Sequence, residues 1–305
     1  MLTDLDQEAL WEYRSTYSAP VDFDVFWGST LTEVRLHDLG LHLTPVDTPL
    51  RTLDVFDVEF TGFGGHPVRG WLRLPRREDP LPAVVQFHGY GHCRGSALEE
   101  LHWASAGYAH LQVEVRGQHG TTGFLTQGIE SRETYAYRAV FADAARAVDA
   151  VRAVPAVDPA RVAVLGNSQG GGIALAAAAL VPDVMAVHAQ APFLCDIRRG
   201  SLVTDRPPYV ELARYLAAHR ESVDSVFEVL SYFDGVGFAS RGRAPAWFSV
   251  GLMDDIVPPS TVFGAFHAYG GRKRMAVWDY NGHEAGGADD VGAVLDWLSK
   301  MEVRL

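Results

Sequence analysis

One segment, residues 161–180, constrains the fold more than any other part of the chain. It opens with a short apolar stretch rich in valine, residues 161–165, of the kind that forms buried strands. A glycine-rich turn, residues 166–170, follows at once, and the small apolar residues from 170 to 180 predict a helix. A strand that turns directly into a helix is the building unit of parallel sheets, so the segment predicts an α/β protein.

The same alternation of strand and helix extends from residue 82 to the end of the chain. The predicted strands are residues 83–87, 109–115, 161–165, 184–189, 246–250 and 275–279, and the predicted helices are residues 96–106, 134–154, 170–180, 259–269 and 289–301. This pattern predicts a doubly wound, mostly parallel sheet with helices on both faces.

A long connection interrupts the alternation after Gln190. About 55 residues separate it from the next predicted strand, which is more than a simple crossover needs. We interpret residues 191–244 as an insertion over the carboxyl edge of the sheet, with helices at 208–219 and 223–232.

The first 80 residues or so look like an extension of this core. Four apolar residues at spacings of four, four and three predict an amphipathic helix over residues 22–37. Two alternating stretches, residues 51–60 and 68–74, flank a turn-rich segment and predict an antiparallel hairpin. Because no linker-like stretch divides the 305 residues, we expect one α/β domain over residues 1–305.

The turn at residues 166–170 has the form Gly-x-Ser-x-Gly, with Ser168 at its centre. In α/β-hydrolases this turn lifts a nucleophilic serine above the sheet, and it requires a strand before it and a helix after it. Gly166 and Gly170 relieve crowding of the strained backbone. A phosphate-binding turn is disfavoured, since neither G-x-G-x-x-G nor a Walker lysine occurs at this position. We therefore predict that Ser168 is a nucleophile.

A serine nucleophile needs a general base and an orienting carboxylate, which in this fold follow it in the order Asp or Glu, then His. His283 lies just past the last predicted strand and is the expected base. Asp254 and Asp255 both follow the preceding strand, and spacing alone does not choose between them. Four histidines that precede these aspartates are expected to be structural or to support the site without taking part in the chemistry: His88, His92, His119 and His188.

The oxyanion of the tetrahedral intermediate needs two N–H donors. The residue after the nucleophile, Gln169, is expected to supply the first. The second is expected from the loop after an early strand, and in the Phe87–Gly91 segment the natural donor is the N–H of Tyr90. Together these residues predict acyl transfer that needs neither a metal nor an organic cofactor.

Net charge, cysteine content and apolar runs limit the classes of ligand and the location that we expect for this protein. A formal net charge of −12 argues against nucleic acid or anionic membranes as ligands. The two cysteines, Cys93 and Cys195, give no disulfide framework and no metal-ligand spacing. The first residues lack a basic stretch followed by an apolar one, and the longest apolar run, residues 173–181, is too short for a membrane span. We expect a soluble cytoplasmic protein.

Beyond single motifs, the chain resembles the acetyl xylan esterase and cephalosporin C deacetylase group, the seventh carbohydrate esterase family. Three elements carry the resemblance in order: Arg116-Gly117-Gln118, the Ser168 turn and His283-Glu284. Further similar stretches extend it from about residue 20 to the end of the chain. Residues 119–123 depart from the family pattern, and we expect them to shape the entrance to the site.

The resemblance implies details that the pattern alone does not. It selects Asp254 as the carboxylate of the triad, and it implies that Arg116 and Gln118 support the site. It implies that Tyr90, Phe193 and Ile256 line a small acyl pocket. The resemblance also implies a hexamer of two stacked trimers, with the insertion at intersubunit contacts. The substrates would then be small acetyl esters: acetylated xylo-oligosaccharides, other acetylated sugars or cephalosporin C.

Overall fold

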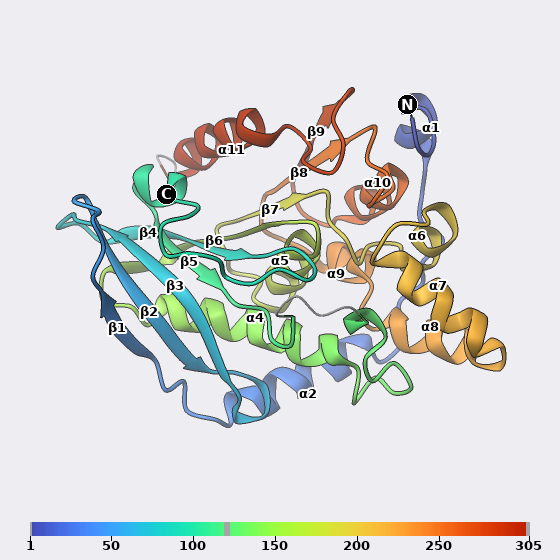
Figure 1. Cartoon of the computed structure of the whole chain (residues 1–305), viewed down its shortest axis with the longest axis horizontal. Coiled ribbons are helices and arrows are strands. Elements are labelled where there is room, and N and C mark those ends of the chain that lie inside the picture. Colours follow the sequence, from blue (N-terminus) through green and yellow to red (C-terminus); the bar gives the residue numbers. More distant parts are fainter. Residues whose placement is uncertain (1, 119–122, 303–305) are drawn as a thin grey trace.

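The computed structural model describes residues 2–118 and 123–302, and its centre is one sheet of nine strands (Figure 1). The strand order is β1-β2-β3-β5-β4-β6-β7-β8-β9. The strands are β1 (His42–Val46), β2 (Leu53–Thr61), β3 (Pro67–Pro75), β4 (Leu81–Phe87), β5 (Ala109–Val113), β6 (Val157–Asn167), β7 (Ala186–Gln190), β8 (Ala246–Gly251) and β9 (Lys273–Trp278). Strands β4 to β9 are mutually parallel, and β1 to β3 are added antiparallel at one edge.

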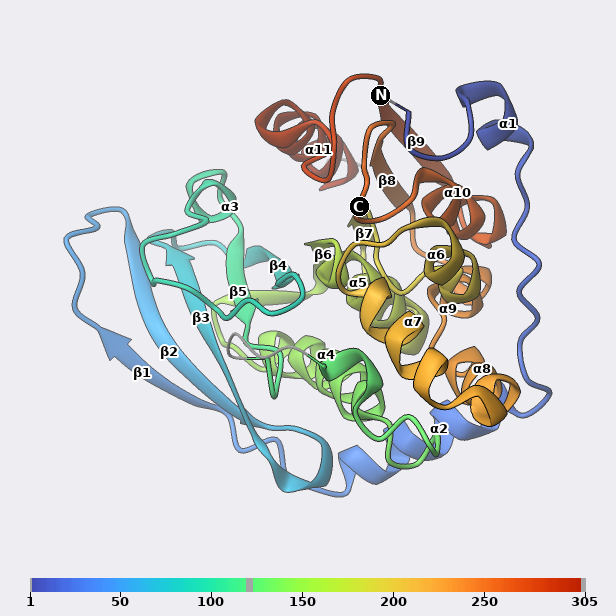
Figure 2. The ribbon, with the colours of Figure 1, turned by 45° about the vertical axis from the view of Figure 1, so that its right-hand side comes forward.

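Helices cover both faces of the sheet, as the alternation predicts (Figure 2). The helices are α1 (Gln7–Glu12), α2 (Phe23–Arg35), α3 (His102–Ser105), α4 (Ala136–Arg152), α5 (Gln169–Leu180), α6 (Ile197–Val203), α7 (Tyr209–Ala218), α8 (Val223–Ser231), α9 (Gly235–Arg241), α10 (Pro259–Ala268) and α11 (Gly287–Glu302). The larger core packs α4, α5 and α10 against one face, with α9 against α5 and α10 and with α2 outside α4. A smaller core packs α3 and α11 against the other face.

The predicted hairpin is confirmed. Strands β2 and β3 pair over their full lengths, from Leu53 opposite Pro75 to Thr61 opposite Pro67. The extension also contains β1 and α1, which the sequence pattern does not reveal. Strand β1 contains Pro45 and lies at the sheet edge, where a residue without an N–H is tolerated.

The helix predicted over residues 96–106 is mostly wrong, because only His102–Ser105 is helical. The carbonyl groups of Ser96 and Ala97 accept hydrogen bonds from the buried guanidinium of Arg73. Glu100 also has a φ of 54°, which a right-handed helix does not allow. A side chain from β3 therefore uses the carbonyl groups that a helix would need.

The insertion contains four helices where two were predicted. Helices α7 and α8 match the prediction, and the short helices α6 and α9 were missed. Helix α9 contains two glycines and begins at Gly235, and the side chain of the preceding Asp234 caps it. The insertion lies on the side of the molecule opposite β1 to β3 (Figure 2). Among the described residues, no helix is long and apolar enough to span a bilayer.

Candidate active site

Ser168 lies at the tight turn between β6 and α5. Its backbone adopts φ 58° and ψ −123°, and its side chain is buried. A Cβ on Gly166 would lie 2.3 Å from the carbonyl carbon of Gly170, and a Cβ on Gly170 would lie 2.0 Å from the carbonyl oxygen of Phe87. Only glycine therefore fits at positions 166 and 170, and the backbone of Ser168 between them holds the strain typical of functional sites.

His283 and Asp254 meet above the carboxyl ends of β8 and β9. The distance from His283 Nδ1 to Asp254 Oδ2 is 2.8 Å, and the carboxylate is fully buried. The other oxygen, Oδ1, accepts hydrogen bonds from the N–H groups of Ile256 and Val257, both at 2.9 Å. Three donors thus fix this carboxylate in one orientation, with one edge directed at the imidazole.

The neighbouring Asp255 lies in a different environment. It is partly exposed and forms an ion pair with Arg206 of the insertion, at 2.7 Å. The sequence left Asp254 and Asp255 open, and the family resemblance chose Asp254. The structure brings Asp254, and not Asp255, against His283.

The loop that carries His283 is tied to the turn that carries Ser168. The Asn167 side-chain amide donates to the carbonyl oxygen of His283 at 3.3 Å. Next to it, the Gln190 amide donates to the carbonyl oxygen of Glu284 at 2.6 Å. Because Asn167 directly precedes Ser168, this contact brings the proposed base and the proposed nucleophile to the same end of the sheet.

The two expected oxyanion loops are joined through Gln118. Its Nε2 donates to Gln169 Oε1 at 2.6 Å, and its Oε1 accepts from Gln169 Nε2 at 3.0 Å. The same Oε1 accepts the N–H of Gly91 at 3.1 Å. The Tyr137 hydroxyl also donates to Gln169 Oε1 at 2.7 Å. Gln118 therefore holds the Tyr90 loop and the start of α5 at a fixed separation.

Arg116 ties the segment that carries Gln118 to α4 and to the β2–β3 turn. Its Nε and Nη2 both donate to the buried carboxylate of Asp143 on α4, with Nη2 at 2.7 Å from Oδ1, and Nη2 also donates to the carbonyl oxygen of Phe63. Burial raises the pKa of Asp143, and the Arg116 guanidinium opposes that shift. At Gly117, with φ +74°, a Cβ would lie 2.9 Å from the Phe124 ring. The Arg-Gly-Gln segment thus links α4, the β2–β3 turn and the oxyanion loops.

Aromatic side chains lie beside the oxyanion loop. The ring of Tyr90 meets that of Phe193 edge to face at 6.2 Å, and Phe193 meets Tyr209 of the insertion at 4.9 Å. The third expected pocket residue, Ile256, is partly buried beside Asp254. Sequence reasoning missed Tyr209 and Glu211, which accepts the Tyr90 hydroxyl at 2.6 Å. No motif marks either residue, because both reach the site only through the packing of α7.

The other histidines have different surroundings. His88 Nε2 accepts the N–H of Val115 at 2.9 Å, which joins the ends of β4 and β5. The buried His188 lies 3.4 Å from Asp290 on α11. His119 and the rest of residues 119–122 lie outside the described residues. Within the described residues, no group of three His, Cys, Asp or Glu side chains could hold a metal ion.

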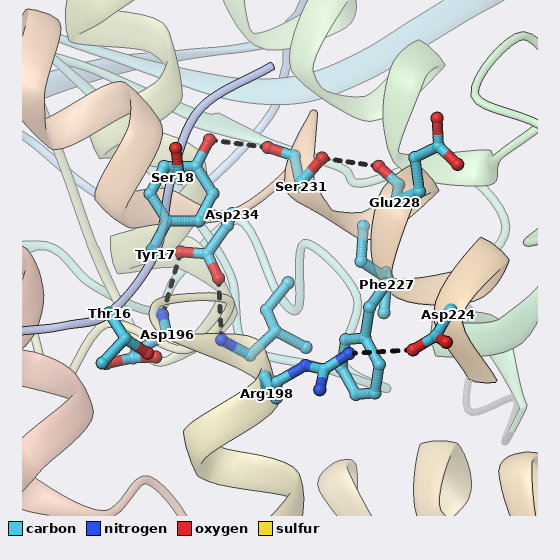
Figure 3. Close-up of a pocket in the computed structure, with 12 residues that line it drawn as sticks. Thr16, Tyr17, Ser18, Asp196, Arg198, Asp224, Phe227, Glu228, Ser231 and Asp234 are labelled. Atoms are coloured by element: carbon cyan, nitrogen blue, oxygen red, sulfur yellow. Dashed lines mark hydrogen bonds and ion pairs between the residues drawn. The ribbon is translucent and has the colours of Figure 1, made fainter.

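A separate cavity of about 310 Å³ lies between residues 16–18 and the insertion (Figure 3). Asp196, Asp234 and Arg198 are among its lining residues. Asp234 accepts the N–H groups of Asp196 and Ile197, so it fixes the start of α6. None of the residues expected to carry chemistry lines this cavity.

Comparisons with known proteins agree with this architecture. The family described as Acetyl xylan esterase (AXE1) matches residues 1–301. The acetyl esterase Axe7A of Xylanibacter ruminicola is 28% identical over an alignment of 303 positions, which covers 92% of this chain and 67% of that protein.

Solved structures are similar over nearly the whole chain. The acetyl xylan esterase from Paenibacillus sp. R4 has a TM-score of 0.92 at 33% identity and covers 97% of this chain and 99% of its own. Acetyl xylan esterase 1 from Thermoanaerobacterium sp. has a TM-score of 0.91 at 32% identity, with 98% and 99% covered. An acylaminoacyl peptidase from Pyrococcus horikoshii, 18% identical with a TM-score of 0.59, shares the fold. The chain therefore belongs to the acetyl xylan esterase family and is a carboxylic ester hydrolase of the α/β-hydrolase fold.

Proposed function

We propose that this esterase removes acetyl groups from small acetylated substrates through an acetyl-Ser168 intermediate, with His283 as general base and Asp254 as its orienting carboxylate. The single observation that carries this assignment is the 2.8 Å contact between His283 Nδ1 and the buried Asp254 carboxylate. That contact keeps the proton on Nδ1 and leaves Nε2 to accept the Ser168 proton.

The reaction follows from these roles. Ser168 Oγ bonds to the acetyl carbon while its proton passes to His283 Nε2, and the carbonyl electron pair becomes the oxyanion. The N–H groups of Gln169 and Tyr90 stabilise this oxyanion, each contributing about 3 kcal/mol. Collapse breaks the ester C–O bond, and His283 gives its proton to the leaving alcohol. Water then attacks acetyl-Ser168 while His283 takes one of its protons. The acetyl–Ser168 bond breaks, His283 gives this proton to Ser168 Oγ, and acetic acid leaves and ionises to acetate.

A small acyl group fits the aromatic surroundings of the site. Phe193 is fully buried against Tyr209, so it has little room to move away from a longer acyl chain. We therefore propose that Tyr90, Phe193 and Ile256 line the acyl pocket. Turnover should fall steeply from acetyl to butyryl esters. A flat profile would favour a broad-range esterase.

Several finer features belong to this proposal. The relatives named above are acetyl and acetyl xylan esterases, which favours acetylated xylo-oligosaccharides, ahead of other acetylated sugars and cephalosporin C, as substrates. We propose a hexamer of two stacked trimers, which light scattering would report as about 200 kDa. The two free cysteines fit a reducing, cytoplasmic setting.

The assignment is tested by variants of the three residues. Ser168→Ala should abolish acetyl release and labelling by a fluorophosphonate probe while the protein stays folded. Asp254→Asn should lower kcat by roughly 10⁴, because the imidazole would then hold the wrong tautomer. Asp255→Asn is the matched control and should keep kcat, since its side chain pairs with Arg206. Near-normal turnover by Ser168→Ala would refute the nucleophile, and loss of activity only in Asp255→Asn would refute the choice of acid.

A further inference from the structure

Glu211 connects the insertion to the loop that carries Tyr90. Its Oε2 accepts the Tyr90 hydroxyl at 2.6 Å and the N–H of Gly123 at 3.0 Å. The Tyr90 hydroxyl in turn accepts the N–H of Leu125 at 2.9 Å. One carboxylate oxygen on α7 therefore joins two segments of the main fold that are more than 30 residues apart.

These contacts hold Tyr90 from both ends. A hydroxyl that donates to Glu211 and accepts from Leu125 has a fixed direction, and the rigid ring transmits that constraint toward the backbone. On the main-chain side, the N–H of the next residue, Gly91, is held by Gln118. The ring of Tyr90 packs edge to face with that of Phe193. Burial and the hydrogen bond to Glu211 raise the pKa of Tyr90, so its hydroxyl keeps the proton that Glu211 accepts.

We propose that Glu211 is a positioning residue of the esterase reaction, which acts through the Tyr90 hydroxyl to hold the Tyr90 N–H where the oxyanion forms. This inference rests on the proposed function, in which that N–H is an oxyanion donor. It gives the insertion a part in catalysis besides any contact between subunits. The carboxylate lies beyond the phenol, so its negative charge is kept at the far end of Tyr90 from the oxyanion.

The positions of oxyanion donors are critical, since a displacement of about 1 Å can lower the rate roughly 100-fold. We expect Glu211→Ala to lower kcat for an acetyl ester about 10- to 100-fold, with KM changed less than about threefold. Glu211→Gln keeps an acceptor oxygen for Tyr90 and should stay within about fivefold of wild type. Glu221→Ala, an exposed glutamate in the turn after α7, is the matched control.

The decisive experiment is a double-mutant cycle with Tyr90→Phe, which removes only the hydroxyl. If Glu211 acts through that hydroxyl, Tyr90→Phe lowers kcat by a similar factor, and adding Glu211→Ala to it lowers kcat by less than about twofold more. Fully additive effects would overturn the proposal, as would a Glu211→Ala or Tyr90→Phe enzyme with wild-type kcat.

The same preparations separate this inference from the proposed function. Acetyl turnover by the wild type and its loss in Ser168→Ala test the function, whatever the Glu211 variants do. Thermal melting checks that each variant is folded. Fluorophosphonate labelling counts its reactive serines, so kcat is expressed per reactive serine. If Glu211→Ala does not fold, Tyr90→Phe and Glu211→Gln carry the test. A kcat lost in Tyr90→Phe and kept in Glu211→Gln supports positioning, and the reverse overturns it.

Discussion

Asp234 offers a quantitative test of how this fold holds a buried carboxyl. The side chain is 4% exposed at the start of α9. Its Oδ1 accepts the N–H groups of Asp196 and Val236, and its Oδ2 accepts that of Ile197 at 2.7 Å. It thereby fixes the loop that follows β7, which includes Phe193 of the proposed acyl pocket. Loss of water and the nearby Asp196 outweigh these three donors and raise the pKa of Asp234 to about 7.

The raised pKa of Asp234 makes the free energy of unfolding depend on pH. Between the ordinary aspartate pKa of 3.8 and the folded pKa of about 7, the folded state keeps a proton that the unfolded state has released. Stability from this proton is fully present below pH 3.8 and is lost as the pH rises through 7. A shift of roughly three pKa units corresponds to about 4 kcal/mol, which is the expected loss in the free energy of unfolding between pH 4 and pH 8.

Asp234→Asn isolates this contribution, because asparagine does not titrate. Urea unfolding of both proteins would be followed from pH 4.5 to 8 at one protein concentration, so that assembly contributes equally. We expect the wild type to lose stability relative to the variant as pH rises, by up to about 4 kcal/mol. Asp224→Asn is the control, because Asp224 is an exposed acid that lines the same 310 Å³ cavity as Asp234, and it should show no such trend. A wild type whose stability stays level with that of Asp234→Asn, or rises relative to it, as the pH increases would show that the three N–H donors outweigh burial and keep Asp234 ionised.

Three further predictions concern the turn and its support. In thermal unfolding, Gly170→Ala should destabilise the protein by about 3 kcal/mol or more, since the new Cβ would lie 2.0 Å from the Phe87 carbonyl oxygen. Gly292→Ala in α11 is the control: its Cβ meets nothing within 4 Å, so the change should be neutral or stabilising by up to about 1 kcal/mol. Arg116→Ala should cost about 3–5 kcal/mol in urea unfolding because it leaves the buried Asp143 carboxylate unpaired; a loss below 1 kcal/mol would contradict this pairing. Ser168→Gly should be more stable than Ser168→Ala by about 1–2 kcal/mol, because only glycine relaxes at φ 58°; equal stabilities would mean the turn is unstrained.

The sequence predicts best what is decided locally. The strand, turn and helix around Ser168 and the alternation that follows are encoded in short stretches, and the structure contains them close to the predicted bounds, except that β6 begins at Val157, four residues before the predicted strand. Residues 96–101 could not be predicted, because Arg73, more than 20 residues away, takes the carbonyl groups that a helix would use. Spacing could not separate Asp254 from Asp255, since adjacent residues have nearly the same place in the chain and differ in where their side chains point. The N–H groups of Ile256 and Val257 set that direction.

The contacts that join the site's loops are mostly made by neutral amides. Asn167 and Gln190 hold the His283 loop, and Gln118 and Gln169 hold the two oxyanion loops. An amide donates and accepts without net charge, so it can bridge backbone groups in a buried place without the desolvation cost of an ion. In the proposed reaction an oxyanion and an imidazolium form between these loops, and a fixed charge there would favour one at the expense of the other. Asp254, which contacts His283, is the charged member of the site itself, whereas the charged groups that support the loops, Arg116 with Asp143 and Glu211 beyond the Tyr90 ring, lie outside this inner layer.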